Sequence, residues 1–215
     1  TDTGVHATTQ VAHFDTQARR PLEAWVRGVN SHLPASVGVL WAVEVDDQFH
    51  ARFSAESRRY RYVLLNRRVR PGLLGGRVGW THGAADEHAM AEAAICLVGE
   101  HDFTSFRAAE CQARSPVRLM HSVAVSRQGD FLLFDFHANA FLHHMIRNLV
   151  GSLVFVGKGR RPAEWMRELL AARNRTLAAP TFAPDGLYLC GVEYPERWPL
   201  PGGGRIIAAP QLLLP

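Results

Sequence analysis

The sequence predicts a mixed α+β fold with a mainly antiparallel sheet, and two observations carry this prediction. First, apolar residues alternate between helical and strand periodicity, and residues 56–195 give the order strand, helix, strand, strand, helix, helix, strand. Second, Gln128-Gly129-Asp130 separates two β-rich runs, as in a hairpin. Apart from one extra helix, this order is the ferredoxin-like β-α-β-β-α-β pattern.

Residues 1–55 are expected to form a partial N-terminal α/β unit. A strand is predicted over residues 7–16, and Pro21 then begins a helix, because proline suits the first helical turn. The apolar stripe of that helix consists of Leu22, Trp25, Val26, Val29 and Leu33. A β-rich run at residues 37–45 closes the unit. Strand, helix and strand make about half of a β-α-β-β-α-β unit, so this first unit is expected to be incomplete.

Residues 56–195 are expected to form a complete C-terminal α/β unit. Its strands are predicted at residues 59–65, 118–126, 131–138 and 187–194. Its helices are predicted at residues 90–98, opening near Asp86, at residues 142–153 and at residues 162–173. The tail of residues 196–215 is rich in proline and glycine, and it is expected to lack regular structure or to pack against a partner.

The amino-acid composition and the net charge limit the kinds of partner that the protein is expected to bind. The chain has 215 residues, 47% of them hydrophobic and 20% charged, which is typical of a globular protein with a sizeable core. Its net charge of +4 permits a nucleic-acid partner, and Lys158 is the single lysine among 24 basic residues. Arginine pairs bidentately with phosphate, although GC-rich coding produces the same bias. No apolar run reaches the roughly 18 residues of a membrane span, and no signal peptide is recognisable, so no membrane partner is expected.

Cysteine and histidine give no metal signature. Cys96, Cys111 and Cys190 are too few and too scattered for a disulfide framework or a zinc site, and their odd number indicates free thiols in a reducing cytoplasm. The eleven histidines show no His-Glu-x-x-His or similar spacing. His143 and His144 are expected on a helix, where neighbours point about 100° apart, so they are not expected to share an ion.

The opening run Thr1-Asp2-Thr3-Gly4-Val5-His6-Ala7 places a carboxylate in a glycine turn. Such an aspartate can act as a nucleophile or base, or it can simply form an Asx turn before the first strand. Asp2-Thr3-Gly4 is also the triplet of aspartic proteases, but no apolar strand precedes it in this sequence and His6 interrupts the usual apolar continuation. Thr1 with a free amine is a further candidate nucleophile, which no other residue supports.

Five blocks in the same order resemble the TruA family of tRNA pseudouridine synthases. The first is the opening run with residues 10–14 (Gln-Val-Ala-His-Phe), which resembles the family's catalytic loop and the strand after it. The others are residues 58–62 (Arg-Arg-Tyr-Arg-Tyr), 99–106 (Gly-Glu-His-Asp-Phe-Thr-Ser-Phe), 139–148 (Asn-Ala-Phe-Leu-His-His-Met-Ile-Arg-Asn) and 186–189 (Gly-Leu-Tyr-Leu). The resemblance spans residues 1–195.

The resemblance implies two ferredoxin-like units side by side, with the catalytic cleft between them, and a homodimer. This sequence also departs from the family pattern in one respect. The family's catalytic loop begins with Gly-Arg after an N-terminal strand and helix, and this sequence, which starts at Thr1, is expected to lack them. The alternative to an active synthase is therefore a non-catalytic RNA-binding fragment of such an enzyme.

The activity that the resemblance implies is the isomerisation of uridine to pseudouridine at positions 38 to 40, in the anticodon stem-loop of tRNA. This reaction breaks the N1–C1′ glycosidic bond, turns the uracil and joins C5 to C1′, so it requires no cofactor and no metal. It does require a carboxylate, and the resemblance assigns that role to Asp2 as the nucleophile. Arg147 matches the family's helix arginine and is expected to keep this carboxylate ionised and aimed.

Tyr60 and Leu187 match residues that the family places around the base. Tyr60 is expected to stack on the uracil, which offsets part of the cost of unstacking it, and to handle the C5 proton. Tyr60 and Tyr62 are expected on opposite faces of the sheet, so that only one of them faces the cleft. Leu187 is expected to wall the base pocket, although plain core packing explains an apolar residue there nearly as well.

Further residues are expected to bind the RNA substrate. Arginines crowd the predicted strand at residues 59–65 and the loop after it, where they could follow the phosphates of a stem-loop. By resemblance, the loop around residue 101 lies near the cleft. The predicted RNA contacts outside the base pocket are Arg58, Arg59, His101, Phe103 and Arg107. A charge run such as residues 67–70 is usually a solvated face.

Overall fold

The computed structural model of the protein describes residues 1–208. The strands are β1 (His6–Ala7), β2 (Ser57–Asn66), β3 (Gly79–Thr81), β4 (Gly99–Asp102), β5 (Val117–Gln128), β6 (Phe131–Ala138), β7 (Leu187–Glu193) and β8 (Arg205–Ile207). The α-helices are α1 (Leu22–Asn30), α2 (Glu87–Ala94), α3 (Met145–Gly157) and α4 (Trp165–Ala172). Over the described residues these elements form one eight-stranded sheet and four α-helices, which confirms the α+β class.

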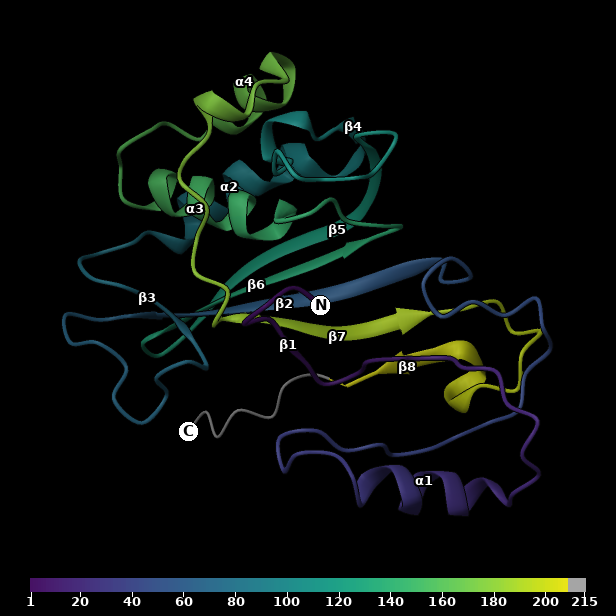
Figure 1. Ribbon diagram of the computed structural model, residues 1–215. Helices are drawn as coiled ribbons and strands as arrows, with labels where there is room; N and C mark the ends of the chain where they lie inside the picture. Colours follow the sequence, from purple (N-terminus) through teal and green to yellow (C-terminus); the bar gives the residue numbers. More distant parts are fainter. Residues whose placement is uncertain (209–215) are drawn as a thin grey trace.

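The sheet runs in the order β1-β7-β2-β6-β5-β4, with β3 paired to β2 and β8 paired to β7 (Figure 1). Its pairings are antiparallel except for β1 with β7 and β2 with β3. The predicted hairpin joins β5 to β6, where Gly129 has a φ of +56° that glycine adopts without strain. The long strand β2 lies at the centre, so it connects β6 on one side to β7 on the other.

The helices α2, α3 and α4 cover one face of the sheet, and α1 lies apart from them, beyond β8 (Figure 1). The main core lies between the covered face and α3, which is buried along nearly its whole length because apolar residues surround it. Tyr62 and Phe134 from the sheet and Leu149 from α3 are fully buried there. No helix within residues 1–208 is both long and apolar enough to cross a membrane.

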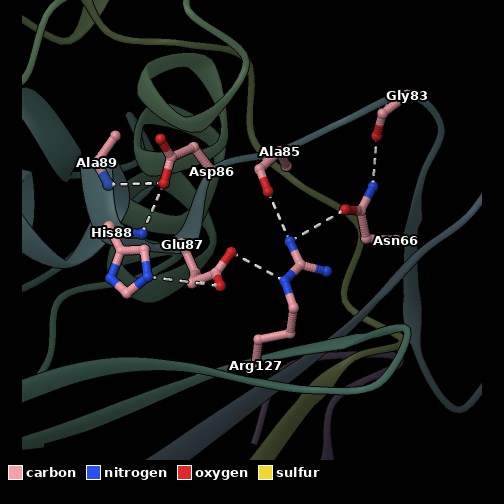
Figure 2. Close-up of polar contacts among 8 residues, drawn as sticks. All are labelled: Asn66, Gly83, Ala85, Asp86, Glu87, His88, Ala89 and Arg127. Atoms are coloured by element: carbon pink, nitrogen blue, oxygen red, sulfur yellow. Dashed lines mark hydrogen bonds and ion pairs between the residues drawn. The ribbon is translucent and has the colours of Figure 1, made fainter.

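The start of α2 is attached to the sheet by a polar cluster (Figure 2). Asp86 caps the helix, since its carboxylate accepts hydrogen bonds from two amides of the first turn at 2.8 and 3.1 Å. Arg127, at the end of β5, donates to the Glu87 carboxylate at 2.9 Å and to the Ala85 carbonyl at 2.6 Å. The prediction that a helix opens near Asp86 is confirmed, and the cluster fixes that helix over β5.

The elements predicted within residues 56–195 are confirmed with shifted ends. The four predicted strands correspond to β2, β5, β6 and β7. The predicted helices correspond to α2, α3 and α4, but α3 begins at Met145, after Leu142, and α4 begins at Trp165, after the predicted start at residue 162. Periodicity finds the apolar face of a helix, whereas the first residue depends on local turn geometry.

Two predicted strands of the first unit are wrong in extent. The strand expected at residues 7–16 is reduced to His6–Ala7, and residues 37–45 form no strand, whereas the predicted helix is present as α1. Strands need neighbours to bond with, and β7 is the only strand that pairs with β1 among residues 1–208. The backbone of Val39 is instead bound by the side chain of Asn30, through hydrogen bonds of 2.7 and 2.8 Å.

Three short strands were not predicted from the sequence. β3, β4 and β8 contain three or four residues each, too few to display a strand period. β8 lies in the segment 196–215, which was expected to be irregular, and it pairs with β7 opposite Gly191. Residues 209–215 of that segment lie outside the described residues. The boundaries proposed for the two units therefore stay predictions, although part of the tail belongs to the sheet.

Candidate active site

The opening loop is a tight turn that exposes Asp2. The Val5 amide donates to the Asp2 carbonyl at 3.0 Å, and Gly4 has a φ of +79°, as the third residue of a type II turn requires. A β-carbon on Gly4 would lie 2.8 Å from Cγ of Pro184, so the close approach also requires glycine. β1 follows the turn directly and pairs with β7. The turn is therefore held against the chain segment that leads into β7.

Two histidines face the carboxylate of Asp2. Nε2 of His143 lies 3.7 Å from Oδ2 of Asp2, and Nε2 of His144 lies 3.9 Å from the same oxygen. The three side chains are 34%, 26% and 40% exposed for His143, His144 and Asp2, respectively. The cluster is thus accessible to a substrate while its members remain close together.

The arrangement of His143 and His144 contradicts the expectation that they point about 100° apart on a helix. α3 begins only at Met145, and His144 precedes it in the left-handed conformation, with φ 58° and ψ 7°. This reversal of the chain places the two rings 3.9 Å apart and 32° from parallel. Helical spacing does not apply to this pair, because His144 lies outside the helix.

The nearest ligand atoms of Asp2, His143 and His144 lie within 4.8 Å of one another, a spacing in which a metal ion could be held. The ring orientation disfavours this use. An imidazole nitrogen binds zinc in the plane of its ring, at about 2.0–2.1 Å. The centroids of the two rings are 3.9 Å apart and their planes are 32° from parallel. One ion therefore cannot lie in both ring planes at that bond length. Without rotation of a ring, the three side chains suit an interaction of imidazoles with a carboxylate better than a metal site.

Arg147, the predicted partner of Asp2, lies in the first turn of α3 and is directed toward Phe182. Its Nε donates to the Phe182 carbonyl at 2.7 Å, and the Phe182 amide donates back to the Arg147 carbonyl at 3.2 Å. Within the described part of the chain, Arg147 and Asp2 form no ion pair at 4.0 Å or less. Burial, followed by the charge of Arg147, lowers the pKa of His144. The role of Arg147 toward Asp2 stays a prediction.

Tyr60, which is predicted to stack on the uracil, lies in β2. The ring is partly buried and packs edge-on against Phe141, with the ring centroids 5.1 Å apart. Burial raises the pKa of Tyr60 to about 12; the charge of Arg58 opposes this rise and that of Asp2 adds to it. At neutral pH the side chain is therefore a neutral phenol. Its role toward the uracil stays a prediction.

Tyr62 packs into the same core as Tyr60, not on the opposite face as expected. The expectation was wrong because residues two apart in a strand share a face. Tyr62 is fully buried, and its hydroxyl donates to the Ala183 carbonyl at 2.8 Å. Gly186 makes room for its ring, since a β-carbon there would lie 2.7 Å from the ring carbon Cε1. Tyr62 thus supports the segment that contacts the opening turn.

Leu187 and Phe103 are core residues. Both belong to the main core, and Phe103 has no exposed surface at all. Phe103 packs against Phe106 and edge-on against His101, whose Nε2 is hydrogen-bonded to the Val98 carbonyl at 2.9 Å. Neither apolar side chain offers surface to RNA in this conformation. Their substrate contacts stay predictions, and packing explains both residues without them.

The three arginines predicted to contact RNA are engaged by the protein. Arg58 donates to the Asn139 carbonyl at 2.8 Å. Arg59 donates to the Glu193 carboxylate through Nε at 2.9 Å and through a terminal nitrogen at 2.8 Å. Arg107 donates to two carbonyls of the loop after it at 2.6 and 2.9 Å. These hydrogen bonds engage all three guanidinium groups within the protein, and their contact with RNA stays a prediction.

Sequence reasoning missed the approach of His143 and His144 to Asp2. The apolar stripe begins at Leu142, so helical periodicity appeared to include both histidines. No Ser, Thr, Asp or Asn directly precedes Met145 to mark the start of the helix. The available signal was the presence of both histidines in one of the five resembling blocks.

Comparison with known proteins identifies the family. A family model described as tRNA pseudouridine synthase matches residues 93–195. A tRNA pseudouridine synthase A of Aromatoleum aromaticum is 66% identical over 212 residues, which cover 99% of this chain and 80% of that protein. Those of Thiobacillus denitrificans and Dechloromonas aromatica are 62% and 60% identical over 201 residues, which cover 94% of this chain and 77% of each relative. With this identity and coverage, the chain belongs to the tRNA pseudouridine synthase family.

Proposed function

We propose that the protein isomerises uridine to pseudouridine in tRNA, with Asp2 as its essential carboxylate. The observation that carries this proposal is the position of Asp2 in a turn that its neighbours hold in one conformation. Gly4 packs against Pro184 on one side of the turn, and two histidines face the carboxylate on the other. A reacting group held in one place needs less reorganisation when the substrate arrives.

Asp2 and Tyr60 supply groups that suit the chemistry. The N1–C1′ bond must break and C5 must join C1′, so a carboxylate is needed beside the base and sugar, and the C5 proton must leave. Asp2 is exposed enough to meet a uridine, whereas Tyr60 offers a phenol ring that can pack on the base. Tyr60, with a pKa of about 12, begins the reaction as a neutral hydrogen-bond donor.

The substrate is assigned here to uridines in the anticodon stem-loop of tRNA, in a cytoplasmic homodimer. Support for tRNA comes from the names of the relatives, which are tRNA pseudouridine synthases A. The stem-loop, the compartment and the dimer rest on the resemblance of the five sequence blocks. In this assignment Arg147 supports the Asp2 carboxylate, and Arg58, Arg59 and Arg107 line the approach of the RNA.

We further propose that the fold consists of two ferredoxin-like units side by side, of which the first is partial here. Support comes from the chain order β2-α2-β5-β6-α3-β7, which has the ferredoxin-like β-α-β-β-α-β sequence. These four strands are neighbours in the order β7-β2-β6-β5, with α2 and α3 on one face (Figure 1). β1 and its turn join this unit at the β7 edge, which supports a cleft beside Asp2 between the two proposed units.

The decisive experiment is tritium release from tRNA transcribed with 5-³H-uridine. Wild type is compared with Asp2→Asn and with Asp15→Asn, which makes the same chemical change at an exposed residue away from the turn. We expect release by wild type and by Asp15→Asn, and none by Asp2→Asn. Mapping the product by chemical probing of pseudouridine then tests the assignment to the anticodon stem-loop.

Two results would contradict the proposal. Equal release by wild type and Asp2→Asn would show that another group does the chemistry. No release by any of the three proteins, with tRNA binding retained, would favour the rival interpretation, a non-catalytic RNA-binding fragment. A gel-shift assay with the same tRNA distinguishes that second result from a simple loss of binding.

A further inference from the structure

We infer that His143 and His144 are positioning residues that hold Oδ2 of the Asp2 carboxylate and so present Oδ1 to the substrate. The inference deepens the proposed function and rests on it. The sequence had assigned neither imidazole to the reaction. In this inference, the role of both imidazoles is to orient the Asp2 carboxylate.

The first step of the argument is that both histidines address the same oxygen. Their Nε2 atoms lie 3.7 and 3.9 Å from Oδ2, and within residues 1–208 no lysine or arginine lies within 4.0 Å of the Asp2 carboxylate. These distances are longer than hydrogen bonds, but contacts in catalytic sites commonly tighten when the substrate binds. An oxygen held by N–H donors is less available for reaction, so the other oxygen is the one left to engage a uridine.

The second step is that hydrogen bonds fix the backbone from which the two rings extend. The His143 amide donates to Sγ of Cys111 at 3.4 Å, and the His143 carbonyl accepts from the Ala108 amide at 3.1 Å. The His144 carbonyl accepts from the Asn148 amide at 3.0 Å, which ties it to α3. The rings also pack on each other, 3.9 Å apart. Restraint of this kind is what a group needs to orient another.

The third step is the left-handed backbone of His144. A non-glycine residue with a φ of 58° is uncommon, and such strain persists only where the surroundings enforce it, often at active sites. In right-handed helical geometry His144 would begin the helix, and its ring would turn away from that of His143. The strained conformation is the feature that brings both rings to one carboxylate oxygen.

The fourth step is the position of Arg147. Its Nε is bound to the Phe182 carbonyl, and its charge acts on His144. The ring of His144, in turn, faces the Asp2 carboxylate. Together with burial, the charge of Arg147 lowers the pKa of His144 and so favours a neutral imidazole, which can face Oδ2 of Asp2 as an N–H donor.

The test uses substitutions that respect the backbone. His144→Gly removes the ring at a left-handed position that glycine adopts freely, and His143→Ala removes the other ring. His144→Asn and His143→Gln are the conservative variants, since asparagine tolerates the left-handed conformation and both amides keep an N–H donor. His88→Ala is the matched control, because His88 is 92% exposed on α2. Single-turnover rates and tRNA dissociation constants are measured for all variants.

We expect the double variant His143→Ala/His144→Gly to lose about 10- to 100-fold in the single-turnover rate, as is common when the groups that orient a reacting ligand are removed. Its tRNA dissociation constant should stay within about twofold of wild type, because neither ring contributes to RNA affinity in this inference. The conservative pair His143→Gln/His144→Asn should recover a measurable part of the rate, and His88→Ala should equal wild type.

Three results would overturn the inference. A double variant as fast as wild type would show that the carboxylate needs no imidazole. A rate loss matched by an equal loss of tRNA affinity would show a role in binding. If the double variant does not fold, the folded conservative pair decides, and a rate at background level would show that N–H donors at these positions do not orient the carboxylate. An inactive wild type, by contrast, would mark a failure of the proposed function itself.

Discussion

The ring of His6 is stacked on the ring of Tyr188, with centroids 4.8 Å apart and planes 22° from parallel. The two residues are also directly opposite each other in the pairing of β1 with β7. The stack is extended on both sides, since His6 is hydrogen-bonded to the Gly76 carbonyl at 3.0 Å and the Tyr188 hydroxyl donates to the Arg77 carbonyl at 2.6 Å. Side chains and backbone together fasten the chain just after the turn that carries Asp2.

Loss of this stack should loosen the turn. We expect His6→Ala to cost about 0.5–1.5 kcal/mol in the free energy of unfolding, the usual value of an aromatic pair, and to lower the turnover rate. Urea denaturation and tritium release measure the two effects. Tyr188→Phe is the control, because it keeps the stack and removes only the hydroxyl. Equal rates for His6→Ala and wild type would show that backbone pairing alone holds the turn.

Gly4→Ala should displace the turn that carries Asp2. The new β-carbon would meet the Pro184 ring at 2.8 Å, at a φ of +79° that alanine resists. We expect at least a roughly tenfold lower turnover rate and a stability loss of about 1–3 kcal/mol. Gly28→Ala in α1 is the matched control: nothing lies within 4 Å of its β-carbon, so it should stabilise the helix slightly. A fully active Gly4→Ala protein would contradict the need for this conformation.

Acid should destabilise the fold through His137. Burial is the largest cause of the lowered pKa of this residue, and the charges of Arg59 and His121 add to it, while that of Glu193 opposes. Since the unfolded chain then binds more protons than the folded one, the free energy of unfolding falls as pH decreases through the window below 6.5. We expect His137→Gln to flatten this slope in urea denaturation between about pH 5 and pH 7. An unchanged slope would assign the effect to other groups, including His144, whose pKa is lowered as well.

Substitution of Arg68 and Arg70, in the exposed loop after β2, should affect tRNA binding differently from substitution of Arg59. Arg59 is paired with Glu193, whereas Arg68 and Arg70 are exposed. We expect Arg68→Gln/Arg70→Gln to weaken tRNA binding and to reduce the slope of log affinity against log salt by about 0.7–0.9 for each phosphate that is no longer neutralised. Arg59→Gln should instead lower stability and change that slope less, because its guanidinium is already paired with the Glu193 carboxylate. The reverse pattern in a salt titration would place RNA on the strand and not on the loop.

How much of the fold could be predicted depended on the length and the surroundings of each element. The strand β2 and the helix α3 are long enough for their apolar period to be read from the sequence. Residues 37–45 also have a strand-like pattern, but they form no strand. The pattern shows which residues are apolar, and it does not show whether a neighbouring strand is available to pair with them. The short strands β3 and β8 exist only because β2 and β7 offer them a bonding edge.

Candidate site residues that stand in a sequence motif could be proposed from the sequence. Contacts that depend on backbone conformation or strand register could not. Asp2 and Tyr60 stand in recognisable blocks, so the sequence could propose both, and their roles stay predictions. The left-handed backbone of His144 leaves no periodic trace in the sequence. The pairing of Arg59 with Glu193 depends on the register of β2 against β7, where Glu193 lies diagonally across from Arg59. Register is a tertiary property, so a single strand read alone cannot reveal it.

The pairing of β1 with β7 has a consequence for biosynthesis. Asp2 is synthesised well before Pro184 and Tyr188, which hold its turn and are added only after β2, β5, β6 and α3 have been made. Contacts so distant in sequence form late, because the intervening chain must be ordered first. A nascent chain halted before Leu187 could therefore fold much of its core while the turn around Asp2 still lacks its support. In this protein the ribosome must complete β7 before the site around Asp2 can assemble.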